Sequence, residues 1–234
     1  MKMILQKIIS NNGYCSRRQA DALIRAGQVK INGQLATIGD QADLNRDTIT
    51  INDRLLSPAD PKIYIKFNKP LGYTCTNRSF KNEKNIFDLI NVPARVFAVG
   101  RLDKDSRGLV LLTNDGDLTQ RLAHPKFQHE KIYEVEVNGE ITNIDKIKTN
   151  FLKGIDLGDT DGIGRAKKIE YLQNRIFIIT LSEGKKRQIR RMFGVMNLEV
   201  IDLKRINLAG LEIGNLPEGR WAYLTTEEIN KLKI

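Results

Sequence analysis

A carboxylate between two apolar runs is the first candidate for chemistry in this sequence. Asp103 follows residues 97–100, whose apolar alternation is typical of a strand, and precedes a second apolar run at residues 109–112. The second run ends at Asn114-Asp115-Gly116, a strong turn signal. We therefore expect Asp103 in a short loop whose ends are fixed by core strands, where a catalytic carboxylate needs to be held. An isolated loop aspartate more often accepts hydrogen bonds from nearby backbone N–H groups, so the rest of the chain decides between these interpretations.

A run of cations is the second candidate. Five of the nine residues at 183–191 are Lys or Arg, and they follow the apolar strand expected at residues 176–181 through a glycine turn. A helix begins in this run, and Arg190 either lies on the surface with the other cations or turns inward as the partner that keeps Asp103 ionised and oriented. Arg187 suits an inward position or the surface. The residues here that we expect to contact a polyanion are Lys185, Lys186, Arg187 and Arg191.

The balance of charged residues favours a polyanionic partner. The 234-residue chain carries 38 Lys and Arg against 28 Asp and Glu, a net charge of +10, which is typical of nucleic-acid binding. No apolar run approaches the ~18–20 residues that span a bilayer, so we expect no membrane partner. The N-terminal residues lack the apolar stretch of a secretory signal, and a cytoplasmic location is expected.

No metal-binding motif is present in the sequence. Cys15 and Cys75 lie far apart and outside any CxxC spacing, so they are expected to be free thiols. His124 and His129 form no recognisable ligand spacing with the carboxylates. The sequence also lacks a Walker motif, a GxGxxG turn after a strand, an HExxH motif and a nucleophile elbow. We therefore expect no metal site.

The first 59 residues predict a small basic module. Two amphipathic helices are expected at residues 4–11 and 16–26, the second with a capping box from Ser16 to Gln19. A hairpin over Asn32-Gly33 and a strand at residues 49–51 complete the unit. The segment from Tyr14 to Gly33 resembles an S4 RNA-binding domain, a resemblance that covers most of residues 3–50. The cations expected to follow RNA phosphates on this module are Arg17, Arg18, Arg25 and Lys30.

A proline-containing linker at residues 56–61 separates this module from a larger domain. The expected domains are residues 1–59, S4-like and RNA-binding, and residues 60–234, catalytic. In the larger domain many strands alternate with short helices, and residues 74–85, with Arg78, Lys81 and Lys84, are expected to form an exposed loop. The predicted fold class is α+β: a small αα/β-hairpin module followed by a mixed, mainly antiparallel sheet.

Several motifs in the right order resemble the pseudouridine synthases of the RsuA-like branch. Gly-Arg-Leu-Asp-x-x-Ser-x-Gly-Leu and Thr-Asn-Asp-Gly stand at residues 100–116, Lys-x-Tyr-x-Val at 131–135, and Gln-Ile-Arg-Arg-Met at 188–192. Gly219-Arg220-Trp221 with Leu224-Thr225 also fits, so the resemblance covers almost the whole chain. Lys186 stands where the family often has Asn.

The resemblance implies a cofactor-free conversion of uridine to pseudouridine in RNA. Asp103 is then the essential carboxylate, which attacks the anomeric carbon or removes the 2′ proton through a glycal. Tyr133 offers a face to the extruded base and a hydroxyl near the proton that leaves C5, and Arg190 is the partner of Asp103. Arg101 and the basic rim hold flanking phosphates. The implied partner is ribosomal RNA or a ribosomal subunit assembly intermediate, with the large subunit favoured over the small one and a monomer expected.

Two other classes of function compete with this prediction. A non-catalytic RNA-binding or ribosome-assembly factor explains the charge and the S4-like module, but it does not require Asp103, Tyr133 and Arg190 in one chain. A glycoside hydrolase that uses Asp103 and Asp105 is disfavoured, because carboxylates two residues apart in a loop rarely face each other across the ~5–9 Å that such chemistry needs.

Overall fold

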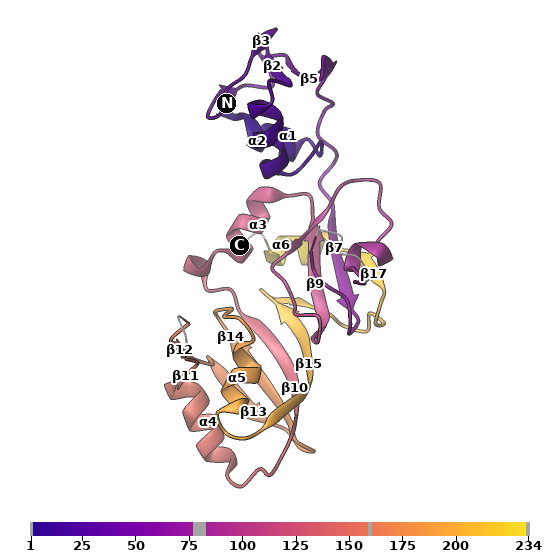
Figure 1. The fold of residues 1–234 in the computed structure, drawn as a ribbon. Coiled ribbons are helices and arrows are strands. Elements are labelled where there is room, and N and C mark those ends of the chain that lie inside the picture. The colour runs from indigo at the N-terminus through magenta and orange to yellow at the C-terminus, as the bar shows by residue number, and fades with distance from the viewer. Residues whose placement is uncertain (1, 77–82, 159–160, 233–234) are drawn as a thin grey trace. The chain divides into compact units, whose positions relative to one another are not determined.

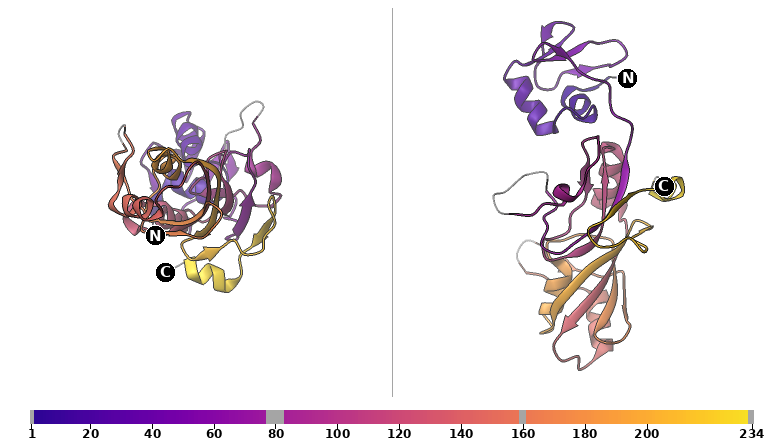
Figure 2. Two further views of the ribbon diagram at one scale, coloured as in Figure 1. Left: turned by 90° about the horizontal axis from the view of Figure 1, so that it is seen from below. Right: turned by 90° about the vertical axis from the view of Figure 1, so that its right-hand side faces the viewer.

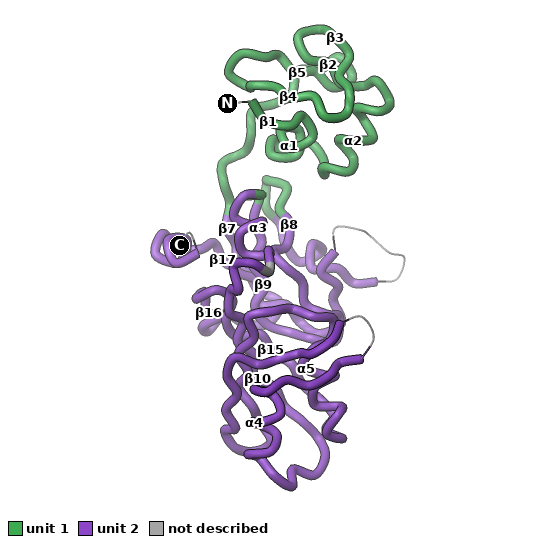
Figure 3. Tube along the Cα trace, turned by 90° about the vertical axis from the view of Figure 1, so that its left-hand side faces the viewer, with its two compact units in different colours: residues 1–63, 92–96, 114–116 green, residues 64–91, 97–113, 117–234 purple. Residues whose placement is uncertain are grey.

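The protein forms two compact units. The computed structural model describes residues 2–76, 83–158 and 161–232 (Figure 1). Unit 1 comprises residues 1–63 with the short segments 92–96 and 114–116, and unit 2 comprises residues 64–91, 97–113 and 117–234 (Figure 3). Each unit is described by itself below.

Unit 1 contains two short helices and small antiparallel sheets. Ser16 caps the second helix as predicted: its hydroxyl accepts from the Gln19 N–H at 3.3 Å, and its own N–H donates to Gln19 Oε1 at 3.0 Å. The predicted hairpin is also present, with positive φ at Asn32 and Gly33, as a type I′ turn requires. The elements are β1 (Met3–Ile4), α1 (Leu5–Asn11), α2 (Arg17–Arg25), β2 (Val29–Ile31), β3 (Gln34–Leu35), β4 (Gln41–Ala42), β5 (Ile49–Ile51) and β6 (Arg54–Leu55).

The two helices of unit 1 bury their apolar faces against its strands. Leu5, Ile8 and Ile9 of α1 and Ile24 of α2 are at most 2% exposed, and they form one core with residues of β2, β4 and β5. Since 3.6-residue periodicity puts these side chains on one face, the arginines of α2 are left on the other.

A mixed sheet is the framework of unit 2. Among the described residues nine strands join it, and β15 with β9 is its parallel pair while the other pairs are antiparallel. The mainly antiparallel α+β fold class is therefore confirmed. In order across the sheet the strands are β13 (Lys168–Tyr171), β14 (Ile176–Leu181), β10 (Lys131–Asn138), β15 (Glu199–Leu208), β9 (Arg107–Thr113), β7 (Tyr64–Lys69) and β17 (Trp221–Tyr223), with β16 (Leu211–Glu212) beside β15 and β8 (Phe97–Val99) beside β9.

Helices cover the sheet and close two apolar clusters. Figure 2 shows β15 running beside β10. The Phe193 ring packs against Phe177 of β14, with ring centroids 5.2 Å apart, and against Phe151, with ring centroids 4.7 Å apart. A second cluster joins Leu109 and Leu111 of β9 to residues of the other helices. The helices are α3 (Gly116–Ala123), α4 (Ile144–Lys153), α5 (Gln188–Gly194) and α6 (Thr226–Leu232), with short 3₁₀ turns at Ile86–Leu89 and Pro125–Phe127 and a hairpin of β11 (Ile155–Asp156) and β12 (Ile163–Gly164).

The segment predicted as an exposed loop at 74–85 is partly described. Thr74 forms an isolated bridge with Asn85, and Asn85 caps the 3₁₀ turn that follows. Arg78 and Lys81 lie outside the described residues.

Candidate active site

The loop that carries Asp103 is fixed at both ends by paired strands. It connects β8 to β9, which are antiparallel with Val99 opposite Leu111. Within the loop, the Ser106 N–H donates to the Asp103 carbonyl at 3.1 Å. The Asp103 side chain is exposed, and it forms no ion pair or hydrogen bond with any described residue. The predicted loop between two paired strands is therefore present, and its carboxylate has no partner among the described residues.

A buried lysine supports this loop from inside the domain. Lys69, at the end of β7, is fully buried, and its ammonium donates to the carbonyls of Ser106 at 2.5 Å, Pro70 at 3.0 Å and Lys104 at 3.5 Å. Burial lowers the pKa of Lys69, an effect that nearby anionic groups oppose. A cation shared by three carbonyls fixes the backbone on either side of Asp105 and immediately after Asp103.

The far end of the loop meets the second half of the sheet at a glycine. Gly108 of β9 pairs with Arg205 of β15 in the parallel register. A Cβ on Gly108 would lie 2.4 Å from the Arg205 carbonyl oxygen and 2.7 Å from its nitrogen, and the φ of +104° is itself unfavourable for other residues. Only glycine allows the two backbones to approach this closely.

Tyr133 lies on the same sheet, opposite that arginine. It is 9% exposed and pairs with Arg205 of β15 on one side and Ile179 of β14 on the other. The register of β10 with β15 shifts between Ile132 and Tyr133, since Ile132 pairs with Asn207 and Tyr133 with Arg205. This irregularity puts Tyr133 and Arg205 directly across from each other, so both side chains stand on one face of the sheet.

A cavity of about 570 Å³ brings these residues together. Asp103 lines it from the loop, and Tyr133 and Arg205 line it from the sheet. Its apolar wall is formed by Leu122, Leu181, Ile189, Leu203 and Leu208, and cations along it are Arg101, Lys131, Lys185, Lys186 and Arg187. The cavity combines a free carboxylate, an aromatic ring and apolar walls, which suits a planar, partly polar ligand.

The predicted pair of Arg190 with Asp103 is wrong. Arg190 Nε lies 3.3 Å from Asp105 Oδ2, while its Nη2 donates to the Asp105 carbonyl and its Nη1 to the Val200 carbonyl, each at 2.6 Å. Arg187 Nη1 also lies 2.7 Å from Asp105 Oδ2. Partial burial disfavours the charged form of Asp105, but the hydrogen bond and charge of Arg187 and the charge of Arg190 together lower its pKa. Both arginines therefore hold the loop through Asp105, which lies two residues beyond the carboxylate that Arg190 was expected to bind.

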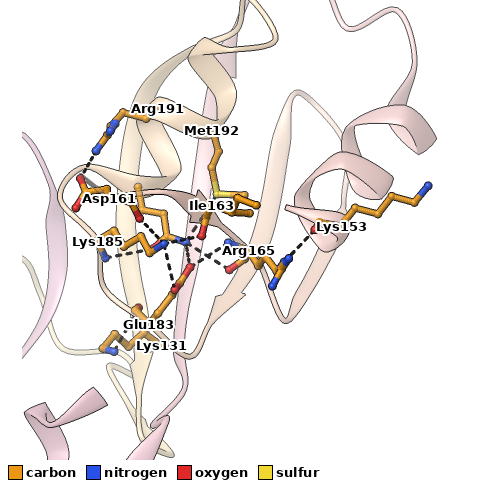
Figure 4. A network of polar contacts seen from close by, with 10 residues as sticks. Lys131, Lys153, Asp161, Ile163, Arg165, Glu183, Lys185, Arg191 and Met192 are labelled. Carbon is orange, nitrogen blue, oxygen red and sulfur yellow. Dashed lines mark hydrogen bonds and ion pairs between the residues drawn. The ribbon is translucent and has the colours of Figure 1, made fainter. Parts of the chain in front are cut away.

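Two predicted RNA-binding cations are engaged within the protein (Figure 4). Lys185 Nζ donates to the carbonyls of Asp161 at 2.7 Å and Ile163 at 2.5 Å, and Arg191 binds the Asp161 carboxylate and the Leu157 carbonyl. Beside them, Glu183 accepts from Gln188 Nε2 at 2.6 Å. Lys185 and Arg191 thus tether the β11–β12 hairpin to α5.

The other predicted RNA contacts are exposed, apart from the half-buried Lys30. Arg101 and Lys186 form no ion pair with any described residue, while Arg187 forms an ion pair with Asp105. In unit 1, Arg17, Arg18 and Arg25 are exposed on α2, and Lys30 Nζ pairs with Asp53 at 2.7 Å. Among the residues that the structure describes, no group of three or more His, Cys, Asp or Glu side chains is placed to hold a metal ion. No described helix is long and apolar enough to cross a membrane.

Sequence reasoning missed the contributions of Lys69, Lys131 and Arg205. Lys69 follows an alternating strand and precedes a Pro-Leu-Gly turn, which gave no sign that its ammonium would be buried. Arg205 stands two residues after Leu203 in β15, so alternation alone places it inward, a signal that was available.

Comparisons with known proteins agree on one family. The model of the RNA pseudouridylate synthase family matches residues 63–194, and that of the S4 domain matches residues 5–45. The dual-specificity RNA pseudouridine synthase RluF of Salmonella typhi is 39% identical over 229 residues, which cover 96% of this chain and 76% of that protein. The ribosomal large subunit pseudouridine synthase B of Bacillus subtilis is 35% identical, over 98% of this chain and 95% of that protein.

The fold agrees as well. The crystal structure of a pseudouridylate synthase superposes with a TM-score of 0.71 at 32% sequence identity, over 98% of this chain and 99% of that one. The resemblance stated from the motifs is thereby confirmed. With an S4 domain at residues 5–45 and a Gly-Arg-Leu-Asp loop that lines its cavity, this chain belongs to the RNA pseudouridylate synthase family.

Proposed function

We propose that this enzyme isomerises a uridine of ribosomal RNA to pseudouridine with Asp103 as its essential carboxylate. The observation that carries the proposal is the shared cavity, in which Asp103 and Tyr133 face the same space from two different parts of the domain. The loop that carries Asp103 is fixed by the contact of Lys69 with the Ser106 carbonyl and by the ion pair of Asp105 with Arg190. The Asp103 carboxylate itself has no partner among the described residues. An oriented and unengaged carboxylate suits attack on a sugar carbon or removal of a sugar proton.

The reaction needs the base to detach, turn and rejoin. The C1′–N1 bond breaks with its electron pair left on uracil, the C5 carbon then forms the bond to C1′, and the C5 proton leaves. Asp103 attacks C1′ or removes the 2′ proton through a glycal. Tyr133 gives the detached base an aromatic face, and its hydroxyl forms no hydrogen bond with a described residue, which leaves it free for the C5 proton.

Exposed cations at the cavity and on unit 1 are proposed to hold the RNA. The target base must leave its stack, at a cost of roughly a few kcal/mol, and phosphate contacts offset that cost. Arg101 and Lys186 stand exposed at the cavity, with Arg187 beside them, and are assigned to the flanking phosphates. The α2 arginines Arg17, Arg18 and Arg25 are assigned to a separate stretch of RNA.

The relatives favour the large ribosomal subunit as the source of the target. Proteins named for the large subunit come from Bacillus subtilis and Vibrio cholerae, at 35% and 32% identity. The RluF relatives are named as dual-specificity enzymes, so a second RNA substrate belongs to the same test. We propose a monomeric, cytoplasmic enzyme that meets its RNA free or within a subunit assembly intermediate.

Tritium release from RNA labelled at uridine C5 tests the proposal. Wild type and Asp103→Asn are compared on large-subunit RNA, small-subunit RNA and immature particles. Release by wild type alone is expected, with RNA binding retained in the variant. Turnover by Asp103→Asn would remove Asp103 from its role, and no release from any RNA by the wild type would favour the RNA-binding factor.

A further inference from the structure

A buried cation of the cavity, Arg205, has no carboxylate partner among the described residues. Arg205 is 2% exposed, and its Nε donates to the Leu109 carbonyl at 2.7 Å. Its Nη2 is buried without a hydrogen-bond partner, and none of its described contacts is with a carboxylate. Leaving a guanidinium donor buried and unpaired is unfavourable, so an arginine in this state is a candidate for a ligand that brings negative charge.

Arg205 also lines the cavity on the side of Tyr133. Tyr133 is its direct partner across the β10–β15 pair, and both residues line the space that Asp103 faces. Lys131, two residues before Tyr133, stands on the same face of the sheet and is half-buried. Burial and the charge of Arg205 lower the pKa of Lys131, in agreement with an excess of positive charge at this wall, which Glu183 offsets in part.

The arginines of the cavity differ in burial, and this difference indicates which of them suit a phosphate and which suits a base. Arg101 and Arg187 are exposed, where a phosphate that keeps part of its hydration can reach them. Arg205 stands among Leu203, Leu208 and Tyr133, in a part of the wall that suits a flat base better than a hydrated phosphate. The base that enters there gains negative charge during the reaction, because the C1′–N1 electron pair is delocalised onto its carbonyl oxygens O2 and O4.

We propose that Arg205 is a catalytic residue that binds a carbonyl oxygen of the target uracil and stabilises the negative charge of the detached base. This inference rests on the proposed function and adds to it a role for Arg205, which makes uracil a better leaving group. It holds for attack by Asp103 and for the glycal route, since uracil leaves as an anion in both. A preorganised donor in a water-poor site acts most strongly where charge develops in the transition state.

Single-turnover kinetics with two RNAs test the role. One RNA carries uridine at the target position and the other carries 5-fluorouridine, whose base is a better leaving anion because fluorine withdraws electrons. The rearranged nucleoside is quantified after digestion. The proteins are the wild type, Arg205→Gln, Arg205→Lys and, as a control, Lys204→Gln, whose side chain lies on the opposite face of the same strand and outside the cavity.

Arg205→Gln is expected to slow the step with uridine about 100-fold, while the Kd for RNA stays within about threefold of the wild-type value. With 5-fluorouridine the loss is expected to be at most about tenfold, because less charge stabilisation is needed. The rate of Arg205→Lys with uridine is expected to lie between the rates of the wild type and Arg205→Gln. The rate of Lys204→Gln is expected to equal that of the wild type.

Equal losses on the two RNAs would overturn the inference, because a purely structural defect does not depend on the leaving group. If Arg205→Gln does not fold, the same comparison with Arg205→Lys decides. A wild type that converts neither RNA contradicts the proposed function itself. An active wild type with leaving-group-independent variants contradicts only the role of Arg205.

Discussion

Gly108 and Arg205 face each other across the parallel strand pair that joins the two halves of the catalytic sheet. A Cβ on Gly108 would lie 2.4 Å from the carbonyl oxygen of Arg205. The loop with Asp103 precedes Gly108, and the strand with Arg205 carries the wall beside Tyr133. The position of Asp103 relative to Tyr133 and Arg205 therefore depends on a close contact between two backbones that only glycine permits.

Gly108→Ala is expected to lower the free energy of unfolding by about 3 kcal/mol, because a methyl group at positive φ meets backbone atoms that have no room to move. Urea unfolding measures the change. The control is Gly194→Ala in α5, where no atom lies within 4 Å of the added Cβ and φ is not positive; this variant is expected to stabilise slightly or leave the transition unchanged. Equal behaviour of the two variants would contradict the close approach.

Lys69→Met is expected to reduce turnover more than stability. The variant removes a buried charge, which is favourable, but leaves the carbonyls of Ser106, Pro70 and Lys104 without their shared donor. The loop then loses its fixed position, and a displacement of about 1 Å can cost about 100-fold in rate. Tritium release and thermal unfolding are compared. A variant that unfolds at lower temperature yet retains its wild-type rate when folded would show that the lysine does not position Asp103.

Asp105 predicts a defined pH dependence of stability. Its pKa is lower in the folded protein than the ordinary value of 3.8, mainly because the pairing with Arg187 and Arg190 outweighs partial burial. The unfolded chain then binds more protons, so the stabilisation is complete above pH ~5, falls as the pH drops through 3.8, and is lost below the lowered pKa. The carboxylate is 45% exposed, so solvent screening limits the effect to at most about 1 kcal/mol.

The difference in unfolding free energy between the wild type and Asp105→Asn, measured in urea from pH 7 to pH 3, checks this dependence. A difference that stays constant through the acid range would contradict the ion pairing of Asp105.

Lys185 and Lys186 are neighbours with different expected roles. Lys186→Gln is expected to weaken RNA binding and to reduce the slope of log Kd against log salt by about 0.7–0.9, as one phosphate contact requires. Lys185→Gln is expected to leave that slope unchanged, because its ammonium is held by the carbonyls of Asp161 and Ile163. Filter binding across a salt series separates the two. Equal slopes for the two variants would contradict the assignment of Lys186 to an RNA phosphate and of Lys185 to the β11–β12 hairpin.

The arginines of α2 allow a similar comparison in unit 1. Arg18 and Arg25 stand seven residues apart on one exposed face, so the double variant with Gln at both positions is expected to lower the salt slope by about 1.5. Lys30→Gln serves as the control, since Lys30 is paired with Asp53. An unchanged slope in the double variant would show that this face does not contact phosphates.

Residues close together in the sequence were enough to predict the local elements and the family. The Ser16 capping box, the Asn32-Gly33 hairpin and the strands around Asp103 were predicted because each depends on residues a few positions apart. The ordered motifs around Asp103, Tyr133 and Arg190 predicted the family, which the comparisons confirm. They did so because residue types at fixed spacing are themselves a property of the sequence.

The partner of each charged side chain at the site follows from the three-dimensional fold and was not predicted. Arg190 and Asp103 were paired in the prediction because one inward guanidinium and one essential carboxylate suit each other. The actual partner, Asp105, is selected by the geometry of a loop that residues 69, 187 and 190 approach from distant parts of the chain. The register shift beside Tyr133 likewise sets Arg205 opposite it. Strand register and the burial of a cation depend on contacts between residues tens of positions apart, which local periodicity does not encode.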